Sequence, residues 1–335
     1  MNKAGIYLNI DAKRTIEKIT AFIRDSVAKH SAEGVVLGLS GGIDSAVLAA
    51  LAVHSIGNQS VQGLYLYDRD SHVGLSENVC TLVDWLGIKL ERTNIEPDMK
   101  KLGIYGPLTV RLVRSSKQIN RFYYWWLRSV LGETPFLTSL RAGCGEKKRD
   151  LKISVFKISG HHVEAAFNGR HRFRRLLAEK WAEKHNYLLL GAANRSEFSI
   201  GWFVKGGIDD LMYQPLVGLY KTQIKQLAVV LHVPDKIQNQ TPSPDMMPGI
   251  SDEIAFGICY DKIDVALDYI NGGLPASAVE EMNITDKELD LVRKMNRYST
   301  WKREGKDIPP PVDGGPKSDL RAIISTERNR REPPF

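Results

Sequence analysis

The chain has only three cysteines in 335 residues, and no two of them lie close together. Cys80, Cys144 and Cys259 form no Cys-x-x-Cys pair, which argues against a disulfide framework and against a cysteine-based zinc site. No apolar run approaches the roughly 20 residues that cross a bilayer. The N-terminal stretch MNKAGIYLNIDAKRT also lacks the apolar core of a signal peptide. We therefore expect a cytoplasmic protein with reduced cysteines and no membrane segment.

The remaining composition is ordinary for a globular protein, with 43% hydrophobic and 25% charged residues. At about 150 residues per domain, the length predicts roughly two domains, or one large α/β domain with additions. The 46 Lys and Arg residues exceed the 39 Asp and Glu residues, so the formal net charge is +7. This excess suits an anionic ligand or a nucleic acid and does not choose between them.

Short apolar runs alternate with helical segments along most of the chain. The pattern predicts strands at 35–39, 61–67, 89–95 and 187–190. Helices are predicted at 12–29, from Asp44 onward, and at about 75–86, 170–185, 219–231, 260–271 and 286–296. Such alternation is typical of an α/β fold with a doubly wound parallel sheet. Ligands of this fold bind beyond the carboxyl ends of the strands.

Residues 106–165 interrupt the alternation with an aromatic and basic stretch whose apolar residues follow a mixed period. We interpret this stretch as a mostly helical or irregular insertion that packs on the sheet domain or on a second subunit. The main domain then comprises residues 1–105 and 166–304. Residues 305–335, which include GKDIPPPVDGGPKS, are predicted to form a loosely ordered C-terminal tail.

The strongest local signal is the sequence GLSGGIDS at 38–45, between the first predicted strand and the next helix. A Ser-Gly-Gly turn leaves backbone N–H groups uncovered, and the helix N-terminus adds a positive dipole end, so the unit suits a phosphate. Asp44 lies in the first helical turn, where a carboxylate can hold Mg²⁺ against the same phosphates. The structural alternative is a plain glycine turn with Asp44 and Ser45 as capping residues. No Gly-Lys-Ser/Thr follows, so the loop is not a Walker loop.

GLSGGIDSA resembles the pyrophosphate-binding loop of the N-type ATP pyrophosphatases, which cleave ATP to AMP and pyrophosphate. Within that group, three later segments are similar to the ammonia-dependent NAD synthetase family: LLLGAANRSEFSIGWFVKGG (188–207), PLVGLYKTQIKQLAVVLHVP (215–234) and TPSPDMMPGISDEIAFGICYDKID (241–264). GLYLYDRDS (63–71) is similar to the tip of the second strand of that family. The resemblance covers about residues 12–95 and 166–303 and implies an adenine nucleotide alpha hydrolase-like fold.

The resemblance implies a set of ATP and magnesium contacts. The implied ATP contacts are Gly38, Leu39, Ser40, Gly41, Gly42, Ile43, Asp44, Ser45, Ala192, Lys221 and Ser243. Asp44 and Glu197 match the magnesium ligands of the family, and two carboxylates from separate loops can bridge one ion to a pyrophosphate. Lys221 matches the lysine that holds ATP phosphate, so Asp44 and Lys221 are the catalytic candidates. The alternatives are a helix-start carboxylate for Glu197 and a solvated lysine for Lys221.

On the acceptor side, the resemblance implies substrate contacts at Arg172, Lys205 and Lys302. Arginine suits a phosphate-bearing substrate because its guanidinium binds phosphate through two hydrogen bonds, although Arg172 on a plain basic helix face is the alternative. Two acids of the family pattern fall on Ile208 and Met212 in this chain.

Asp209 and Asp210 lie beside those two positions and are the candidate substitutes for the lost acids, with Asp209 assigned to the substrate. The Gly-Thr of the family becomes Gly191-Ala192, and Trp301 stands where histidine is usual. These changes concern recognition of the acceptor more than binding of ATP.

The resemblance implies a ligase that adenylates deamido-NAD with ATP and Mg²⁺ and then forms NAD with ammonia. The synthetase motif begins by residue 35, so we expect no preceding glutaminase domain, and a separate protein can supply the ammonia. Family members are usually homodimers. Two alternatives stay open. One is a related ligase or tRNA-modifying enzyme with another acceptor, because the aromatic and basic residues of 111–175 can stack on RNA, although insertion packing is the more ordinary explanation. The other is a non-catalytic nucleotide-binding paralogue.

Overall fold

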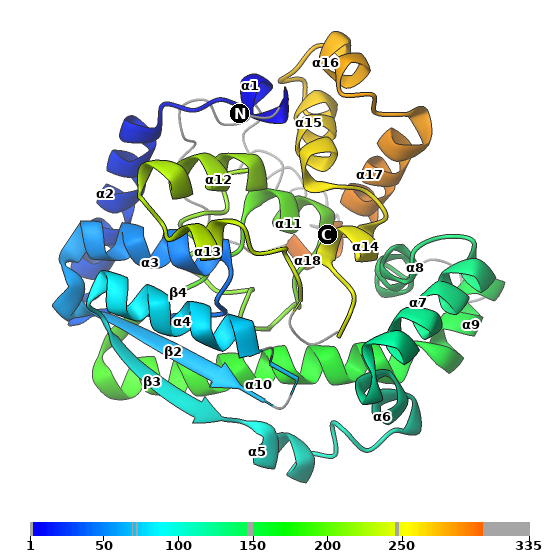
Figure 1. The fold of residues 1–335 in the computed structure, drawn as a ribbon, viewed down its shortest axis with the longest axis horizontal. Helices are drawn as coiled ribbons and strands as arrows, with labels where there is room; N and C mark the ends of the chain where they lie inside the picture. The colour runs from blue at the N-terminus through cyan, green and yellow to red at the C-terminus, as the bar shows by residue number, and fades with distance from the viewer. Residues whose placement is uncertain (1–2, 69, 72, 146–149, 245–247, 304–335) are drawn as a thin grey trace, which may run out of the picture.

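The computed structural model describes residues 3–68, 70–71, 73–145, 150–244 and 248–303 (Figure 1). In this part of the chain, four strands form one parallel sheet in the order β3-β2-β1-β4. The strands are β1 (Gly34–Gly38), β2 (Val61–Tyr67), β3 (Lys89–Asn94) and β4 (Tyr187–Leu190). The predicted tail at 305–335 lies outside the described residues. The four predicted strands are thus confirmed, each within about one residue.

Helices cover both faces of the sheet, as the doubly wound fold requires. Val35 and Leu37 of β1 pack into a core with helices of one face, which are α2 (Ala12–His30), α3 (Ile43–Ile56), α4 (Val73–Leu86), α12 (Lys221–Val230) and α13 (Asp235–Gln238). Val36 points the other way and packs with Ala178 and Ala182 of α10 (His161–His185). Figure 1 shows α10 running along the sheet as one long helix. Alternation along β1 therefore builds two cores from one buried strand.

A second body of helices lies beyond the carboxyl ends of the strands. It is built around Phe256, Tyr260 and Val292, all buried. Its members are α1 (Lys3–Tyr7), α11 (Arg195–Ile200), α14 (Asp252–Phe256), α15 (Tyr260–Ile270), α16 (Ala276–Glu281), α17 (Asp286–Tyr298) and α18 (Thr300–Arg303). The short helix η1 (Asn58–Ser60) precedes β2. This arrangement leaves the end of β1 facing a second layer, which forms the far wall of the site.

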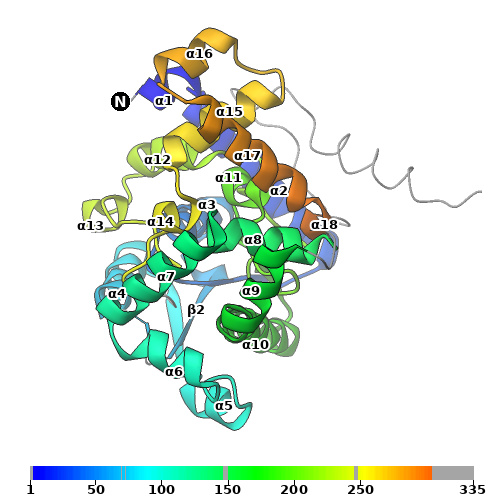
Figure 2. The same cartoon turned by 90° about the vertical axis from the view of Figure 1, so that its right-hand side faces the viewer.

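The described part of the predicted insertion is mostly helical. After α5 (Glu96–Lys101) it contains α6 (Leu108–Ser115), α7 (Lys117–Leu131), α8 (Pro135–Gly143) and α9 (Leu151–Ser159). Figure 2 shows α7, α8 and α9 gathered on one side of the molecule, and these three helices contact one another. The helix predicted at 170–185 starts at His161, nine residues earlier than the sequence pattern indicates. No single apolar stripe marks its first turns, because α10 packs first on α6 and α9 and only later on the sheet.

A buried ion-pair network fixes the insertion to the end of β2. Arg114 of α6 and Arg170 of α10 both contact Asp70, at 2.5 and 2.7 Å, and Arg170 also lies 3.3 Å from Asp68. The Tyr105 hydroxyl donates a 2.8 Å hydrogen bond to Asp68. Burial raises the pKa of Asp68, but Arg170 and Arg174 bring it below its usual value. Moving α6 away would leave buried charges of this network without their partners, which is energetically costly. The network therefore holds α6 in one position.

Within the residues that the structure describes, no helix combines the length and the apolar character needed to span a bilayer.

Candidate functional site

A cavity of about 370 Å³ opens at the carboxyl ends of β1 and β4. This is the point where the strand order reverses, since β2 and β3 lie on one side of β1 and β4 lies on the other. Its lining includes nearly all of the predicted ATP contacts, which are Gly38, Leu39, Ser40, Gly42, Ile43, Asp44, Ser45, Ala192, Lys221 and Ser243. Gly41 belongs to the same turn but does not line the cavity.

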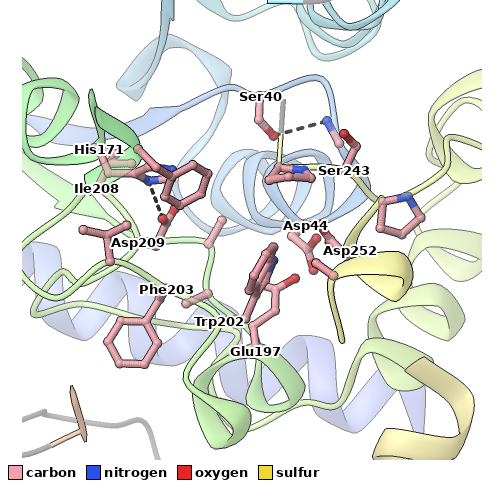
Figure 3. Close-up of a pocket in the computed structure, with 18 of the residues that line it drawn as sticks. Ser40, Asp44, His171, Glu197, Trp202, Phe203, Ile208, Asp209, Ser243 and Asp252 are labelled. Atoms are coloured by element: carbon pink, nitrogen blue, oxygen red, sulfur yellow. Dashed lines mark hydrogen bonds and ion pairs between the residues drawn. The ribbon is translucent and has the colours of Figure 1, made fainter. Parts of the chain in front are cut away.

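Local chemistry fixes the turn after β1 in an open shape. Gly41 has φ of +78°, and a Cβ at this position would overlap the backbone oxygen of Leu75, so only glycine fits. The Ser45 hydroxyl donates to Gly42 O at 3.1 Å and accepts from the Ser40 N–H at 3.3 Å. The Ser40 hydroxyl in turn accepts from the Gly42 N–H at 3.2 Å, as a dashed line in Figure 3 shows. The turn is therefore held from within while its outer face borders the cavity.

Lys221 places a buried ammonium beside this turn. The residue is 2% exposed at the start of α12, and its Nζ lies 2.5 Å from Asp44 Oδ2 and 3.2 Å from Glu197 Oε1. Asn194, the N-cap of α11, donates from Nδ2 to Asp44 Oδ1 at 2.9 Å. The three predicted residues Asp44, Glu197 and Lys221 thus meet at one point, although they are 24 to 177 positions apart in the chain.

Asp252 and Tyr260 complete this cluster, which we call the carboxylate cluster: Asp44, Glu197, Asp252, Lys221 and Tyr260. The Tyr260 hydroxyl lies 2.8 Å from Asp252 Oδ2 and 3.1 Å from Glu197 Oε1. Burial raises the pKa of Asp252 to about 6, against the effect of Lys221, and Asp44 adds to the rise. Burial also raises the pKa of Glu197 to about 8, against the effect of Lys221, and Asp44 and Asp252 add to the rise. Burial is therefore the main cause of both shifts.

The donors of the carboxylate cluster fit Mg²⁺. Magnesium prefers hard oxygen ligands and usually takes one or two protein carboxylates together with substrate phosphates. Asp44 and Glu197 lie next to the turn that suits a phosphate, and Asp252 lines the same cavity. In the described ranges no three acidic, histidine or cysteine side chains already stand in metal-binding geometry. The site therefore has suitable metal ligands, but the protein side chains alone do not form a complete metal-binding site.

The acceptor side of the cavity carries a different set of charges. Asp209 lies there, and its Oδ2 is 2.7 Å from His171 Nδ1 (Figure 3). Burial raises the pKa of Asp209, but His171, Arg174 and Lys302 bring it below its usual value. Lys302 lines the same region and donates to the backbone oxygens of Gly201 and Phe203 at 2.9 and 2.7 Å. Burial lowers the pKa of Lys302 to about 8, despite the nearby acids.

Two predicted substrate residues lie outside this cavity. Arg172 is exposed and donates from Nε to the backbone oxygen of Lys205 at 3.3 Å. Lys205 is also exposed, and its Nζ donates to the backbone oxygen of Trp301 at 2.6 Å. Arg174, two residues further along α10, lines the cavity instead. The roles of Arg172 and Lys205 stay predictions, and within this chain Arg174 is the arginine that borders the cavity from α10.

The structure separates the two candidate substitutes for the lost acids. Asp209 faces the cavity, whereas Asp210 is 8% exposed and accepts a 2.7 Å hydrogen bond from the Gly206 N–H. Ile208 lines the cavity at the position of one lost acid, and Met212 is 62% exposed at the other. An acid is therefore present on this wall, one residue after the expected place.

Sequence reasoning missed the contribution of the insertion to the site. Its helices and the first turn of α10 supply one wall of the cavity, through Asn120, Tyr123, Tyr124, Leu127, Pro135, Phe136, Ser139, Phe156, Gly160, Val163 and Glu164. Phe167 and His171 of α10 continue this wall, and their rings contact each other at a tilt, with 4.7 Å between the centroids. An excess of aromatic residues in the insertion was the available signal. It indicates a packed surface but does not reveal which side faces a cavity.

Fold and site together have the features of an adenine nucleotide alpha hydrolase-like protein: a parallel sheet, an open glycine turn at its switch point, and a lysine with carboxylates beside the turn. The sequence model of the NAD synthase family matches residues 15–105 and 152–306 of this chain. The chain is 32% identical over 300 residues to the NH₃-dependent NAD⁺ synthetase of Thermotoga neapolitana, covering 89% of this chain and 96% of that one. It is also 32% identical to the protein of the same name from Coprothermobacter proteolyticus, covering 88% and 97%.

The chain therefore belongs to the NAD synthase family, whose members are ligases. Two solved structures share its fold. NMN synthetase from Francisella tularensis has a TM-score of 0.63 at 24% identity, covering 90% of this chain and 99% of that one. NH₃-dependent NAD synthetase from Campylobacter jejuni has a TM-score of 0.57 at 20% identity, covering 89% and 99%.

Proposed function

We propose that this chain converts deamido-NAD to NAD with ammonia, consuming ATP in the presence of Mg²⁺ and releasing AMP and pyrophosphate. The observation that carries the proposal is the meeting of the open turn at Gly41 with the Lys221 ammonium and Asp44, at one end of a cavity that also holds an acceptor-side acid. The names of the relatives from Thermotoga and Coprothermobacter support the same reaction.

In this reaction the nicotinate carboxylate attacks the α-phosphorus of ATP. A new oxygen–phosphorus bond forms, and the bond to the departing pyrophosphate breaks. Ammonia then attacks the acyl carbon, the carbon–nitrogen bond forms, AMP departs with the carboxylate oxygen, and the nitrogen loses a proton. Adenylation is required because the oxygen of a free carboxylate is a poor leaving group.

The residues of the chain stabilise the charge that develops in the first step. The N-terminus of α3 and the Lys221 ammonium are placed to bind the pyrophosphate oxygens, in a buried site where such contacts are strong. Asp44 and Glu197 would hold Mg²⁺, which when bound neutralises phosphate charge and lowers the barrier to departure of the pyrophosphate. On the acceptor wall, Asp209 supplies a negative charge that suits an ammonium ion, and His171 orients it.

The test is a balance of products with purified protein, ATP, Mg²⁺, deamido-NAD and ammonium. We expect pyrophosphate, AMP and NAD in equal amounts. Nicotinate mononucleotide is the second acid to supply, because a structural neighbour is named for NMN synthesis. Pyrophosphate release only with that acid, or with tRNA, would assign a different acceptor. ATP binding without pyrophosphate release would favour a non-catalytic paralogue.

Arg174→Ala is expected to raise the KM for the acceptor by about tenfold, with a change in the KM for ATP of less than threefold. The reason is that Arg174 lines the cavity near Asp209, where a phosphate-bearing acceptor meets a guanidinium, and a charge-assisted contact contributes about 1.5–3 kcal/mol. Arg172→Ala is the matched control, since Arg172 lies outside the cavity. Steady-state kinetics with each substrate varied provide the measurement. A larger acceptor effect for Arg172 would place the substrate elsewhere.

We further propose a homodimer formed through the outer side of the insertion. On α7 the residues Ile119, Phe122, Trp125, Trp126 and Val130 are 44 to 74% exposed and share one face of the helix. Leu108 and Leu112 of α6 and Ile158 of α9 extend the exposed apolar surface to neighbouring helices. Monomeric proteins rarely leave so large an apolar area in water, so a second copy is the proposed cover.

Trp125→Glu is expected to convert this dimer to a monomer, as measured by sedimentation equilibrium. A charge placed in an apolar interface is desolvated without a partner. Segment 106–165 contains eleven Lys and Arg against four Asp and Glu, so two such surfaces repel each other, and we expect salt to strengthen the wild-type dimer. Val229→Glu on α12, at a site 61% exposed, is the control that keeps the dimer. A monomeric wild type at micromolar concentration would end this proposal.

A cytoplasmic location is proposed with the same function. Cys80, Cys144 and Cys259 are all free thiols in the structure, which suits a reducing compartment where ATP is also abundant.

A further inference from the structure

The inner face of α7 forms one wall of the cavity. Tyr123 and Leu127 line the cavity, whereas Phe122 of the same helix is 74% exposed on the outer face. The residues that match the NAD synthase family model are 15–105 and 152–306, and α7 lies in the stretch between them. The contacts of this wall are therefore not among those that the family model describes.

Hydrogen bonds to the second body of helices hold α7 over the cavity. The Tyr124 hydroxyl donates to the backbone oxygen of Ile254 in α14 at 2.9 Å. Asn120 is 2% exposed and donates from Nδ2 to the backbone oxygen of Pro248 at 2.8 Å, just before α14. Because these bonds join α7 to the far side of the cavity, the wall is formed before any ligand binds.

Aromatic side chains give this part of the cavity its character. Tyr123 comes from α7 and Phe136 from α8, and Phe136 packs edge to face against Trp202 with 4.8 Å between the ring centroids. Aromatic side chains that line a cavity favour a flat ring, because such a ring stacks on them and removes apolar surface from water. Ser139, one turn after Phe136, donates to Glu164 at 2.7 Å, and both also line the cavity. They can bond to the polar edge of a heteroaromatic ring.

Charges place this wall on the acceptor side. Burial lowers the pKa of Lys302 to about 8, and the nearby charges of Glu164 and Asp209 oppose that shift. Glu164 of the wall and Asp209 of the acceptor side therefore lie close to the same ammonium. Figure 3 shows Asp209 on one side of the pocket and Asp44, beside the phosphate-binding turn, on the other. A ring held by the insertion thus lies nearer to the acceptor than to the phosphates of ATP.

We propose that the inner face of α7, together with Phe136 of α8, binds a flat heteroaromatic ring of the acceptor and so determines which acid this chain accepts. The inference rests on the proposed function for the reaction that follows. Deamido-NAD offers two such rings, the pyridine that carries the carboxylate and the adenine at its other end. Nicotinate mononucleotide offers only the pyridine. The subunit that binds ATP also supplies this ring subsite.

The experiment measures, by calorimetry, the Kd of deamido-NAD, of nicotinate mononucleotide and of ATP, each alone. Tyr123→Ala and Phe136→Leu each remove a ring and are expected to raise the Kd for the acceptor by about tenfold, while the Kd for ATP changes by less than threefold. Tyr123→Phe keeps the ring and loses only the hydroxyl, which donates to the backbone oxygen of Ser159, so it should bind within about twofold of wild type. Phe122→Ala, the neighbouring ring on the outer face, is the matched control and should leave every Kd unchanged. Thermal melts verify the fold of each variant.

The two acids identify the ring. A weaker Kd for both acids assigns the wall to the pyridine, and a weaker Kd for deamido-NAD alone assigns it to the adenine. The inference is wrong if wild type binds neither acid, if Phe122→Ala weakens binding as much as Tyr123→Ala, or if only the Kd for ATP rises. Equal losses in Tyr123→Phe and Tyr123→Ala would also contradict it, because the hydroxyl and not the ring would then matter. Failure of the proposed function shows separately, as a wild type that binds an acid but releases no pyrophosphate.

Discussion

Asp44→Asn is expected to lower the rate of pyrophosphate release by about 10³-fold or more, because a metal-held phosphate charge contributes several kcal/mol to the transition state. Asp44 is the carboxylate closest to Lys221 and also accepts from Asn194. The amide of asparagine carries no charge, so it holds neither the ammonium nor Mg²⁺ in the same way. The measurement is kcat for pyrophosphate release with ATP and acceptor saturating.

The fold should survive this substitution. Asparagine has the size of aspartate, its oxygen still accepts one hydrogen bond, and Lys221 keeps Glu197 as a partner. The loss of stability should stay near 1 kcal/mol, which corresponds to about 2–4 °C in the melting temperature of a domain of this size class. Asp25→Asn, at an exposed position of α2, is the control for both readouts. Turnover within threefold of wild type would remove Asp44 from the metal-binding role.

The central sheet could be predicted because its strands are buried on both faces. Such strands appear in a sequence as continuous apolar runs, and Val35-Val36-Leu37 is one of them. The turn at Gly41 and the position of Asp44 follow from local chemistry alone, since a positive φ and a helix start are both encoded within a few residues. The convergence of Asp44, Glu197 and Lys221 came from the family resemblance, and no local pattern would have shown it.

The remaining features of the site could not be predicted, because they depend on contacts between segments that are distant in the sequence. Asp252 follows Ser251, which caps α14, so in the sequence it resembles an ordinary acidic residue of a first helical turn. Its place in the carboxylate cluster appears only when the Tyr260 hydroxyl, which contacts both Asp252 and Glu197, is placed against it. His171 stands among the basic residues of α10 and contacts Asp209, which lies on a separate loop. Likewise, the apolar residues of α7 point to both sides, and only packing shows that Tyr124 is buried while Trp125 is exposed.

We expect the largest change in stability when the hydrogen-bond network of Ser196, Asp264 and Thr222 is broken. Asp264 is fully buried, and it accepts hydrogen bonds from the N–H and the hydroxyl of Thr222 at 2.8 and 2.7 Å. The Ser196 hydroxyl also donates to Asp264, and Ser196 Oγ accepts from the Lys221 N–H at 2.8 Å. Burial raises the pKa of Asp264 to about 6, so the group is ionised at neutral pH and depends on these donors. The network therefore ties α15 to the helices that carry Lys221 and Glu197.

Asp264→Ala leaves three buried donors without their acceptor, and each unsatisfied group costs about 1–3 kcal/mol. We expect a loss of roughly 4 kcal/mol in the free energy of unfolding, measured by urea denaturation, since such effects are not fully additive. Asp261→Ala is the matched control on the same helix. Its carboxylate is 28% exposed and lies 3.7 Å from Lys225, so its loss should cost no more than about 1 kcal/mol.

Because Lys221 loses its fixed backbone position, the KM for ATP should rise in Asp264→Ala and stay unchanged in Asp261→Ala. Equal stability losses in the two variants would show that the buried network does not hold the helix of Lys221.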